Sequence, residues 1–218
     1  MQKTITVKGI GKISAKPDYV LLFMLLKSCD TDYDKSMELA DKELEQLKEA
    51  LSGVGFDKKA LKTVDFNVRT EYNNVDDGLG NYRREFNGYS VNHRLKLEFD
   101  LDSKKLSNAL SAVSGCLSDP ELSIAFTVKD VSAVNEELLC AAAQNAEHKA
   151  KVLCGASGVE LGELLSIDYS WNELNIRSDT RCKVPRFLKS APASAVSVDI
   201  EPDDIDVRDT ATFVWEIR

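Results

Sequence analysis

The chain has 218 residues, of which 43% are hydrophobic and 29% are charged, and its formal net charge is -8. This composition excludes a disordered chain and predicts a globular protein with a sizeable core. The acidic balance argues against general binding to nucleic acid or to anionic membranes, because both require a cationic surface.

The longest apolar run argues against a membrane-spanning helix. It covers the eight residues from Tyr19 to Leu26, whereas a helical span needs about 20. The first residues, Met1 to Val7, alternate like a strand and lack the apolar segment of a signal peptide. The sequence as written therefore predicts a cytoplasmic protein, or a periplasmic or extracytoplasmic one if a leader was removed.

Strands are predicted at residues 3–8 and 18–28, with Gly9, Gly11 and Pro17 as the punctuation between them. A phosphate-binding glycine loop would lead directly into a helix, and here a strand follows. We therefore interpret the two glycines as a turn or bulge that carries the chain between strands.

A helix is predicted next, because apolar residues recur at spacings of three and four. They form one stripe: Tyr33, Met37, Ala40, Leu44, Leu47 and Leu51. Asp30 or Asp32 can cap the start of this helix, and Gly53 and Gly55 mark its end. Fewer than three heptads favour a helix packed on a sheet over a coiled coil.

Two alternating segments then predict an antiparallel hairpin. One face of the first carries Val64, Phe66, Val68 and Tyr72; one face of the second carries Tyr89, Val91, His93, Leu95, Leu97 and Phe99. Polar residues occupy the opposite face of the second segment, so one side of the sheet is expected to be wet. The turn falls in the Asp- and Gly-rich residues 76–81.

The second half repeats this plan. The expected elements are a helix from about Ser103 to Asp119, a strand at 122–128, a helix at 131–154, a strand at 164–171 and a closing strand at 205–217. The apolar stripe of the first of these helices runs from Leu106 to Leu117.

Two predicted strands have closely similar sequences. Residues 61–68 match residues 164–171 in type at an offset of 103, and Gly55 matches Gly158 at the same offset. The sequence thus predicts an α+β fold of duplicated βαββ units, with an antiparallel sheet and helices packed on one face. We expect one domain over residues 1–218, with an internal repeat at about 19–101 and 122–217 and an extra strand in front.

Several motifs in this order resemble the bacterial SIMPL domain family. They are Val7-Lys8-Gly9-Ile10-Gly11, Pro17-Asp18, Thr63, Asn87-Gly88-Tyr89, the helix with Ala142, Ala143, Ala146 and Ala150, and Gly158 through Leu161-Gly162. The resemblance covers nearly the whole chain. It implies similarity to a periplasmic immunogenic protein that assembles into a channel-like ring. It also implies a link to stress tolerance. No established enzymatic activity, catalytic residue or cofactor comes with the resemblance.

The candidate partner site is the irregular stretch 172–204. It carries five cations and an apolar anchor, Phe187. The cations are Arg177, Arg181, Lys183, Arg186 and Lys189. Within an acidic protein this loop could dock on the acidic surface of a neighbouring subunit. A mobile solvated loop is the alternative. The alanine-rich helix could also pack closely on the sheet or on another subunit.

Two functions are compatible with the residues. The favoured one is a non-enzymatic homo-oligomer that serves as a scaffold or binding shell, without metal or cofactor. The alternative is a small-molecule enzyme or a redox sensor that uses Cys182 or His93. His93 lies among apolar strand positions, which favours a hydrogen-bonded core histidine, and the five cysteines are scattered without a CxxC pair.

Overall fold

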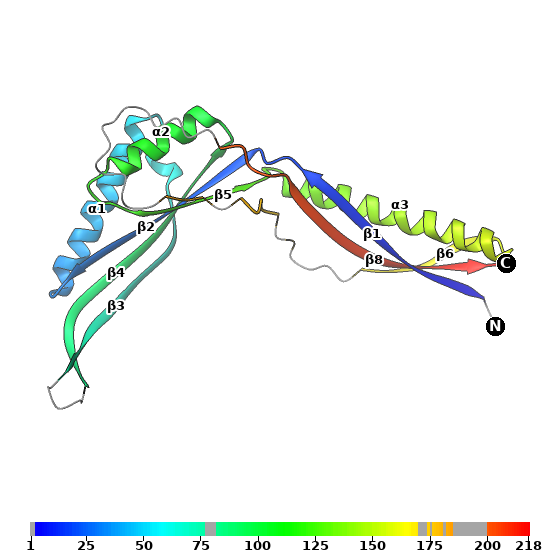
Figure 1. The fold of residues 1–218 in the computed structure, drawn as a ribbon, viewed down its shortest axis with the longest axis horizontal. Coiled ribbons are helices and arrows are strands. Elements are labelled where there is room, and N and C mark those ends of the chain that lie inside the picture. The colour runs from blue at the N-terminus through cyan, green and yellow to red at the C-terminus, as the bar shows by residue number, and fades with distance from the viewer. Residues whose placement is uncertain (1–2, 77–81, 170–173, 175, 181, 185–199) are drawn as a thin grey trace. The chain divides into compact units, whose positions relative to one another are not determined.

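The computed structural model describes residues 3–76, 82–169, 174, 176–180, 182–184 and 200–218. Their elements are β1 (Thr4–Ala15), β2 (Tyr19–Asp30), α1 (Tyr33–Gly53), a 3-10 turn (Lys58–Ala60), β3 (Lys62–Asp76), β4 (Tyr82–Asp100), α2 (Ser103–Ser114), β5 (Glu121–Thr127), α3 (Val131–Ser157), β6 (Leu161–Asp168), β7 (Cys182–Val184) and β8 (Ile205–Ile217). The described strands form two antiparallel sheets, with the orders β3-β4-β2-β5-β7 and β1-β8-β6 (Figure 1). The predicted α+β class is confirmed.

The chain divides into two compact units. The first contains residues 1–18, 126–179 and 202–218, and the second contains residues 19–125 and 180–201. The order strand, helix, strand, strand occurs twice along the chain, and β7 is additional in the second occurrence. Duplication of one unit and the single domain over 1–218 stay predictions.

In the second unit, α1 packs on β2 and β4 and α2 packs against α1. Alternate residues of β2 and β4 face the helices and are buried, among them Leu22, Met24, Leu95 and Leu97. Burial of such side chains contributes about 1.5–3 kcal/mol each relative to exposure. The predicted alternation of β4 is therefore confirmed from Val91 to Phe99.

The helix boundaries follow from capping. Asp32 caps α1 by accepting a hydrogen bond from the Lys35 amide at 3.1 Å, and the helix ends at Gly53. Both features agree with the sequence prediction. The prediction for α2 was wrong at its end: the helix stops at Ser114, and Leu117 lies beyond it with 85% of its surface exposed.

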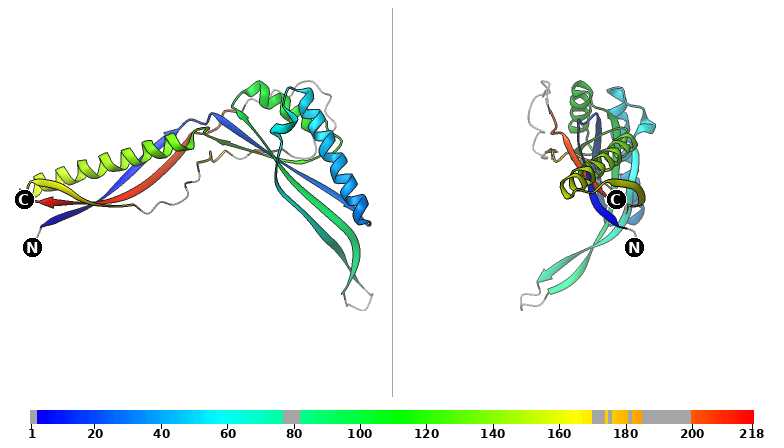
Figure 2. Two further views of the ribbon diagram at one scale, coloured as in Figure 1. Left: turned by 180° about the vertical axis from the view of Figure 1, so that it is seen from behind. Right: turned by 90° about the vertical axis from the view of Figure 1, so that its right-hand side faces the viewer.

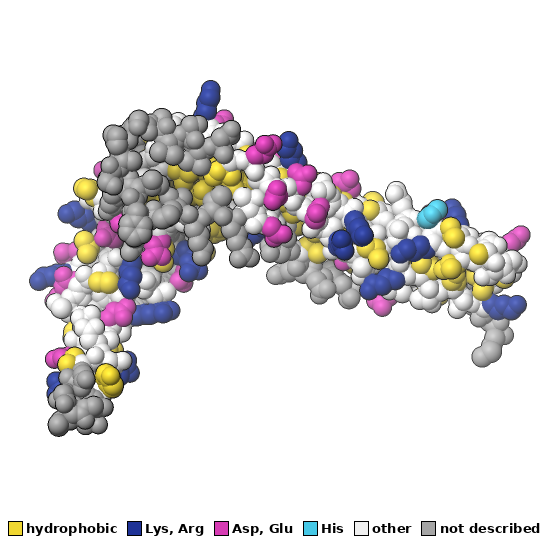
Figure 3. Space-filling model, in the orientation of Figure 1, with side chains coloured by type: hydrophobic (Ala, Val, Ile, Leu, Met, Phe, Trp, Pro, Cys, Tyr) yellow, Lys and Arg dark blue, Asp and Glu magenta, His cyan; other side chains and the backbone are white. Residues whose placement is uncertain are grey.

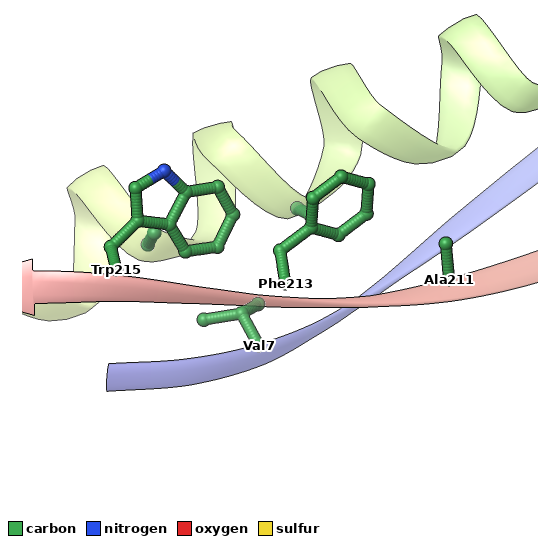
Figure 4. Close-up of a cluster of buried hydrophobic side chains, with 6 residues drawn as sticks. Val7, Ala211, Phe213 and Trp215 are labelled. Carbon is green, nitrogen blue, oxygen red and sulfur yellow. The ribbon is translucent and has the colours of Figure 1, made fainter. Parts of the chain in front are cut away.

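In the first unit, α3 covers one face of the β1-β8-β6 sheet. Its buried residues include Ala142, Ala146 and Ala150, which meet Val7 of β1 and an aromatic pair of β8. That pair is Phe213 and Trp215, stacked with ring centroids 5.6 Å apart (Figure 4). The small side chains let the helix approach the sheet closely, so the alanine stripe packs on the chain's own sheet.

The expected turn or bulge at Gly9 and Gly11 was wrong, because both glycines lie inside the continuous strand β1, which pairs with β8 without a register shift. A Cβ atom at Gly9 would lie 2.1 Å from the Ala142 carbonyl oxygen, and one at Gly11 would lie 2.1 Å from the Leu138 carbonyl oxygen. The sequence needs glycine here because the helix backbone rests directly on the strand. Their spacing of two residues places them on one face.

The outer edge of β1 is partly covered by the same helix. The Asn145 side-chain oxygen accepts a hydrogen bond from the Ile10 amide at 3.1 Å, and the Lys149 ammonium donates to the Lys8 carbonyl oxygen at 3.0 Å. These bonds occupy backbone groups that could otherwise pair with another strand. The β1 edge is therefore less available for strand addition than its length implies.

Candidate interaction site

The predicted partner loop is only partly described. Arg177 is exposed and forms an isolated antiparallel bridge with Thr127. The backbones of Cys182 and Lys183 belong to β7, which pairs with β5, and their side chains are outside the description. The other candidates lie outside the described residues: Arg181, Arg186, Phe187 and Lys189.

The first part of this loop is bound to the first unit. The Thr127 hydroxyl donates to the Ile176 carbonyl oxygen at 2.5 Å, and the Ser178 amide donates to the Phe126 carbonyl oxygen at 2.9 Å. Ile176 itself is buried in a cluster with Leu138 of α3 and neighbouring apolar side chains. Residues 176 and 178 therefore have a structural role, whereas the Arg177 side chain is exposed.

His93 has the environment of a core histidine. Its Nε2 atom lies 2.8 Å from the Thr63 hydroxyl, its ring meets Phe66 edge to face at 5.0 Å, and 6% of its surface is exposed. Burial lowers the pKa of His93, Lys48 lowers it further, and the nearby Asp41 carboxylate opposes this shift. The neutral imidazole can accept a hydrogen bond from the Thr63 hydroxyl or donate one to it, depending on its tautomer. Either hydrogen bond is sufficient to explain a polar residue at this buried position.

A more exposed feature is the end of the β3–β4 hairpin. β2 pairs with β4 from Asp100 back to Tyr89, and beyond Tyr89 the described part of β4 pairs with β3 alone. We call residues 69–76 and 82–88 the arm; Figures 1 and 2 show these strands continuing past the end of β2. Both outer edges of the arm carry backbone groups without a strand partner among the described residues.

One face of the arm is aromatic. Tyr72 pairs with Phe86 across the arm, and strand alternation places Tyr82 on the same face. Their exposed fractions are 47% for Tyr72, 47% for Phe86 and 74% for Tyr82. The Arg84 guanidinium lies 4.6 Å from the centroid of the Tyr72 ring, a cation–π distance. We call Tyr72, Tyr82 and Phe86 the aromatic face.

Ring contacts connect this face to the base of α1. Phe86 meets Tyr89 at 5.4 Å, and Tyr89 meets Tyr33 at 5.5 Å, both edge to face. Tyr33 is the first residue of α1 and is 48% exposed. A row of aromatic rings therefore runs from the start of a helix along a two-stranded hairpin, with one side open to solvent.

A bulge fixes the junction between the arm and the sheet. The register shifts between Glu71 and Tyr72, which pair with Gly88 and Phe86, so Asn87 is the extra residue. Gly88 has a positive φ of 125°, and a Cβ atom there would lie 2.5 Å from the Asp30 carbonyl oxygen. The bulge keeps Phe86 and Tyr89 on the same face although they are three residues apart.

The comparisons with known proteins identify the family. A family model described as "SIMPL: Protein of unknown function (DUF541)" matches residues 5–215. The chain belongs to the SIMPL family. It is also 25% identical over 220 residues to the 26 kDa periplasmic immunogenic protein of Brucella melitensis biotype 1, covering 98% of this chain and 84% of that protein. The resemblance inferred from the sequence is confirmed.

Membership of the SIMPL family carries no assigned activity, so function has to be argued from this chain's own surfaces. Among the described residues, no cluster of three His, Cys, Asp or Glu side chains could hold a metal ion. Cys29, Cys116, Cys140 and Cys154 are free thiols. No helix within the described part of the chain is long and apolar enough to span a membrane.

The arm was missed as a site at the sequence level, although the hairpin was predicted. Its signal was available: residues 82–88 continue the strand pattern well beyond the point at which residues 19–30 can pair with it. Strand alternation alone does not show that β2 stops pairing with β4 at Tyr89 while β3 continues to pair with it. The uncovered aromatic face became visible only in the tertiary structure.

Proposed function

We propose that this SIMPL protein is a non-enzymatic scaffold or binding shell built from several copies of the same chain. The observation that carries the proposal is the uncovered aromatic face of the arm. An isolated two-stranded hairpin is at best marginally stable in water, and three strands or a packed face are normally needed. A neighbouring copy would supply the missing packing.

The aromatic face has the chemistry of a protein–protein contact. Tyrosine, phenylalanine and arginine are enriched at the centres of such interfaces, and Tyr72, Phe86 and Arg84 lie together on the arm. The opposite face of the arm carries mostly polar and charged residues, such as Glu71 and Arg83, together with the exposed apolar side chain of Val75. This difference between the two faces supports docking through the aromatic face and argues against non-specific hydrophobic association.

The basic loop remains a second contact within this proposal. Arg177 is exposed, and the loop could still engage the acidic surface of a neighbour. A role in stress tolerance, implied by the family resemblance, also belongs to the proposal, as does the cellular location. The Brucella relative is named as periplasmic; for this chain, a cytoplasmic location and a periplasmic or extracytoplasmic one are the two alternatives.

The proposal is tested by the mass of the protein in solution. Light scattering is expected to give a multiple of the 24.2 kDa chain mass for the unmodified protein. A Tyr72→Ser/Phe86→Ser variant is expected to shift the mass toward that of one chain. The matched control is Val75→Ser, which removes an exposed apolar side chain from the opposite face of the arm and should leave the mass unchanged.

Circular dichroism of each variant separates loss of assembly from loss of folding. A monomeric unmodified protein at micromolar concentration would contradict the proposal. The same conclusion would follow if the double variant stayed folded and kept the full mass, since the arm would then play no part in assembly.

A further inference from the structure

One edge of β4 is open along the arm. β2 covers this edge only as far as Tyr89, which pairs with Asp30, the last residue of β2. Residues 82–86 of β4 pair with β3 on their other side, and no other described strand lies beside them. Every second residue of such an edge directs its N–H and C=O groups outward, where another strand can bind them. We call residues 82–86 the open edge.

The side chains of the open edge differ between its two faces. Tyr82, Arg84 and Phe86 alternate onto the side of the aromatic face, and Arg83 and Glu85 alternate onto the other side. All five side chains are exposed, and Figure 3 shows hydrophobic and charged side chains at the surface of the arm. Arg83 and Glu85 contact each other at 3.9 Å. An ion pair this long between exposed side chains contributes little, so both charges remain available to a partner.

The sequence of the open edge is complementary to itself when two copies run antiparallel. We place Arg84 opposite Arg84 of the second copy. Each Arg83 then lies opposite Glu85 of the other copy. Each Tyr82 lies opposite Phe86 of the other copy. Side chains that are directly opposite share one face of a sheet, so this register contains two opposite-charge pairs and two aromatic pairs, both of which stabilise a sheet.

This register contains one pair of like charges, Arg84 opposite Arg84. Each guanidinium lies 4.6 Å from the centroid of the Tyr72 ring of its own copy. Tyr72 belongs to β3, on the far side of the arm from the open edge. The cation–π contact therefore draws the two guanidinium groups away from each other.

Neighbouring registers are less favourable. A shift of one residue would place the two aromatic faces on opposite sides of the joined sheet, because side chains alternate along a strand. A shift of two residues would place Glu85 opposite Glu85 in one direction and Arg83 opposite Arg83 in the other. Like charges directly opposite each other destabilise a sheet. The charges and the aromatic residues thus favour the same register.

We propose that two copies of this chain join through their open edges in this register, forming a four-stranded antiparallel sheet in the order β3-β4-β4-β3. The inference rests on the proposed assembly and specifies its contact. A two-stranded hairpin is marginally stable alone, whereas three or more strands with an apolar face are stable. The contact is isologous, with a two-fold axis between the two Arg84 residues, so an assembly in which every arm is engaged contains an even number of copies.

Charge reversal tests the pairing, with the mass of the full chain measured by light scattering. Arg83→Glu places a carboxylate opposite Glu85 at two symmetric positions and is expected to lower the assembled mass at least twofold. Glu85→Arg should have the same effect. Arg83→Glu/Glu85→Arg should restore the mass, because each pair again has opposite charges. The matched control is Arg69→Glu, which reverses an exposed charge of the arm on β3 and should leave the mass unchanged.

An introduced thiol tests the register. Directly opposite residues of antiparallel strands have Cα atoms about 4.5–5.5 Å apart, a separation that a disulfide can bridge. Under mild oxidation, Arg84→Cys should therefore give two chains joined through the introduced thiol, detected by non-reducing electrophoresis and located by peptide mass spectrometry. Glu85→Cys is the control. The two copies of residue 85 lie two residues out of register, so this variant should form no such link.

The outcomes separate this contact from the proposed assembly. A monomeric unmodified protein overturns the assembly and the contact with it. An assembled protein whose mass does not change in Arg83→Glu overturns the contact alone. Loss of mass in Arg83→Glu that Glu85→Arg does not rescue also overturns the contact, whereas rescue excludes misfolding as the cause of the lower mass. A link in Glu85→Cys in place of Arg84→Cys overturns the register.

Discussion

The backbone of Gly9 rests against the carbonyl group of Ala142, so that a Cβ atom at Gly9 would lie 2.1 Å from that oxygen and 2.9 Å from the Ala146 Cβ atom. The first distance is far below any van der Waals contact, and the atom in the way belongs to a helix backbone. Strand and helix therefore pack together only with glycine at this position.

Gly9→Ala is expected to destabilise the protein by about 1–3 kcal/mol or more, because α3 must shift away from β1. The measurement is the midpoint of urea unfolding. Gly53→Ala is the matched control: nothing lies within 4 Å of a Cβ atom there, and the residue ends a helix, where alanine is favoured over glycine. Equal midpoints for Gly9→Ala and the unmodified protein would contradict the close packing.

Stability is expected to fall in mildly acidic solution because of His93. Its pKa is lowered in the folded protein by burial, while the unfolded chain keeps a pKa of about 6.5. As the pH falls through about 6.5, the unfolded state binds the proton first, so the free energy of unfolding decreases. Above that pH the contribution is fully present.

The check is the urea midpoint measured from pH 8 to pH 5 for the unmodified protein and for His93→Gln. The variant should lose this part of the pH dependence, whereas His148→Gln, at an exposed helix position, should retain it. If His93→Gln and the unmodified protein showed the same pH profile, His93 would not be the group responsible.

Gly88→Ala should weaken the junction between the arm and the sheet. The residue has a φ of 125°, and its Cβ atom would meet the Asp30 carbonyl oxygen at 2.5 Å, so both backbone strain and crowding act together. We expect a loss of about 1–3 kcal/mol and faster amide exchange at Tyr89 and its neighbours. Asn87→Ala, in the same bulge, is the control and should change exchange far less.

Gly158 provides a backbone test without crowding. It caps α3 in the left-handed conformation, with φ 70° and ψ 27°, and nothing lies within 4 Å of a Cβ atom. Gly158→Ala is expected to cost about 1–2 kcal/mol, and Gly158→Asn should cost less, since asparagine tolerates this conformation. Thermal unfolding of the two variants gives the comparison; an alanine variant as stable as the asparagine variant would contradict it.

The sequence alone determined most of the local structure and the family. Apolar spacing located α1 and α2, alternation located β4 and β8, and Asp32 was identified as a possible cap. These features depend on neighbours within a few positions, which the sequence states directly. Gly55 and Gly158, matched at an offset of 103, both adopt positive φ after a helix, in keeping with the predicted repeat.

Only the tertiary structure decided which strands became neighbours. β6 and β8 are neighbours in one sheet, and β1 pairs with the other edge of β8. β5 corresponds to β2 at the repeat offset, but it belongs to the other sheet. The roles of Gly9 and Gly11 depended on that choice, because a glycine inside a strand and one in a turn look alike until the packed helix is placed. The uncovered arm also arises from long-range pairing, which periodicity along one chain does not encode.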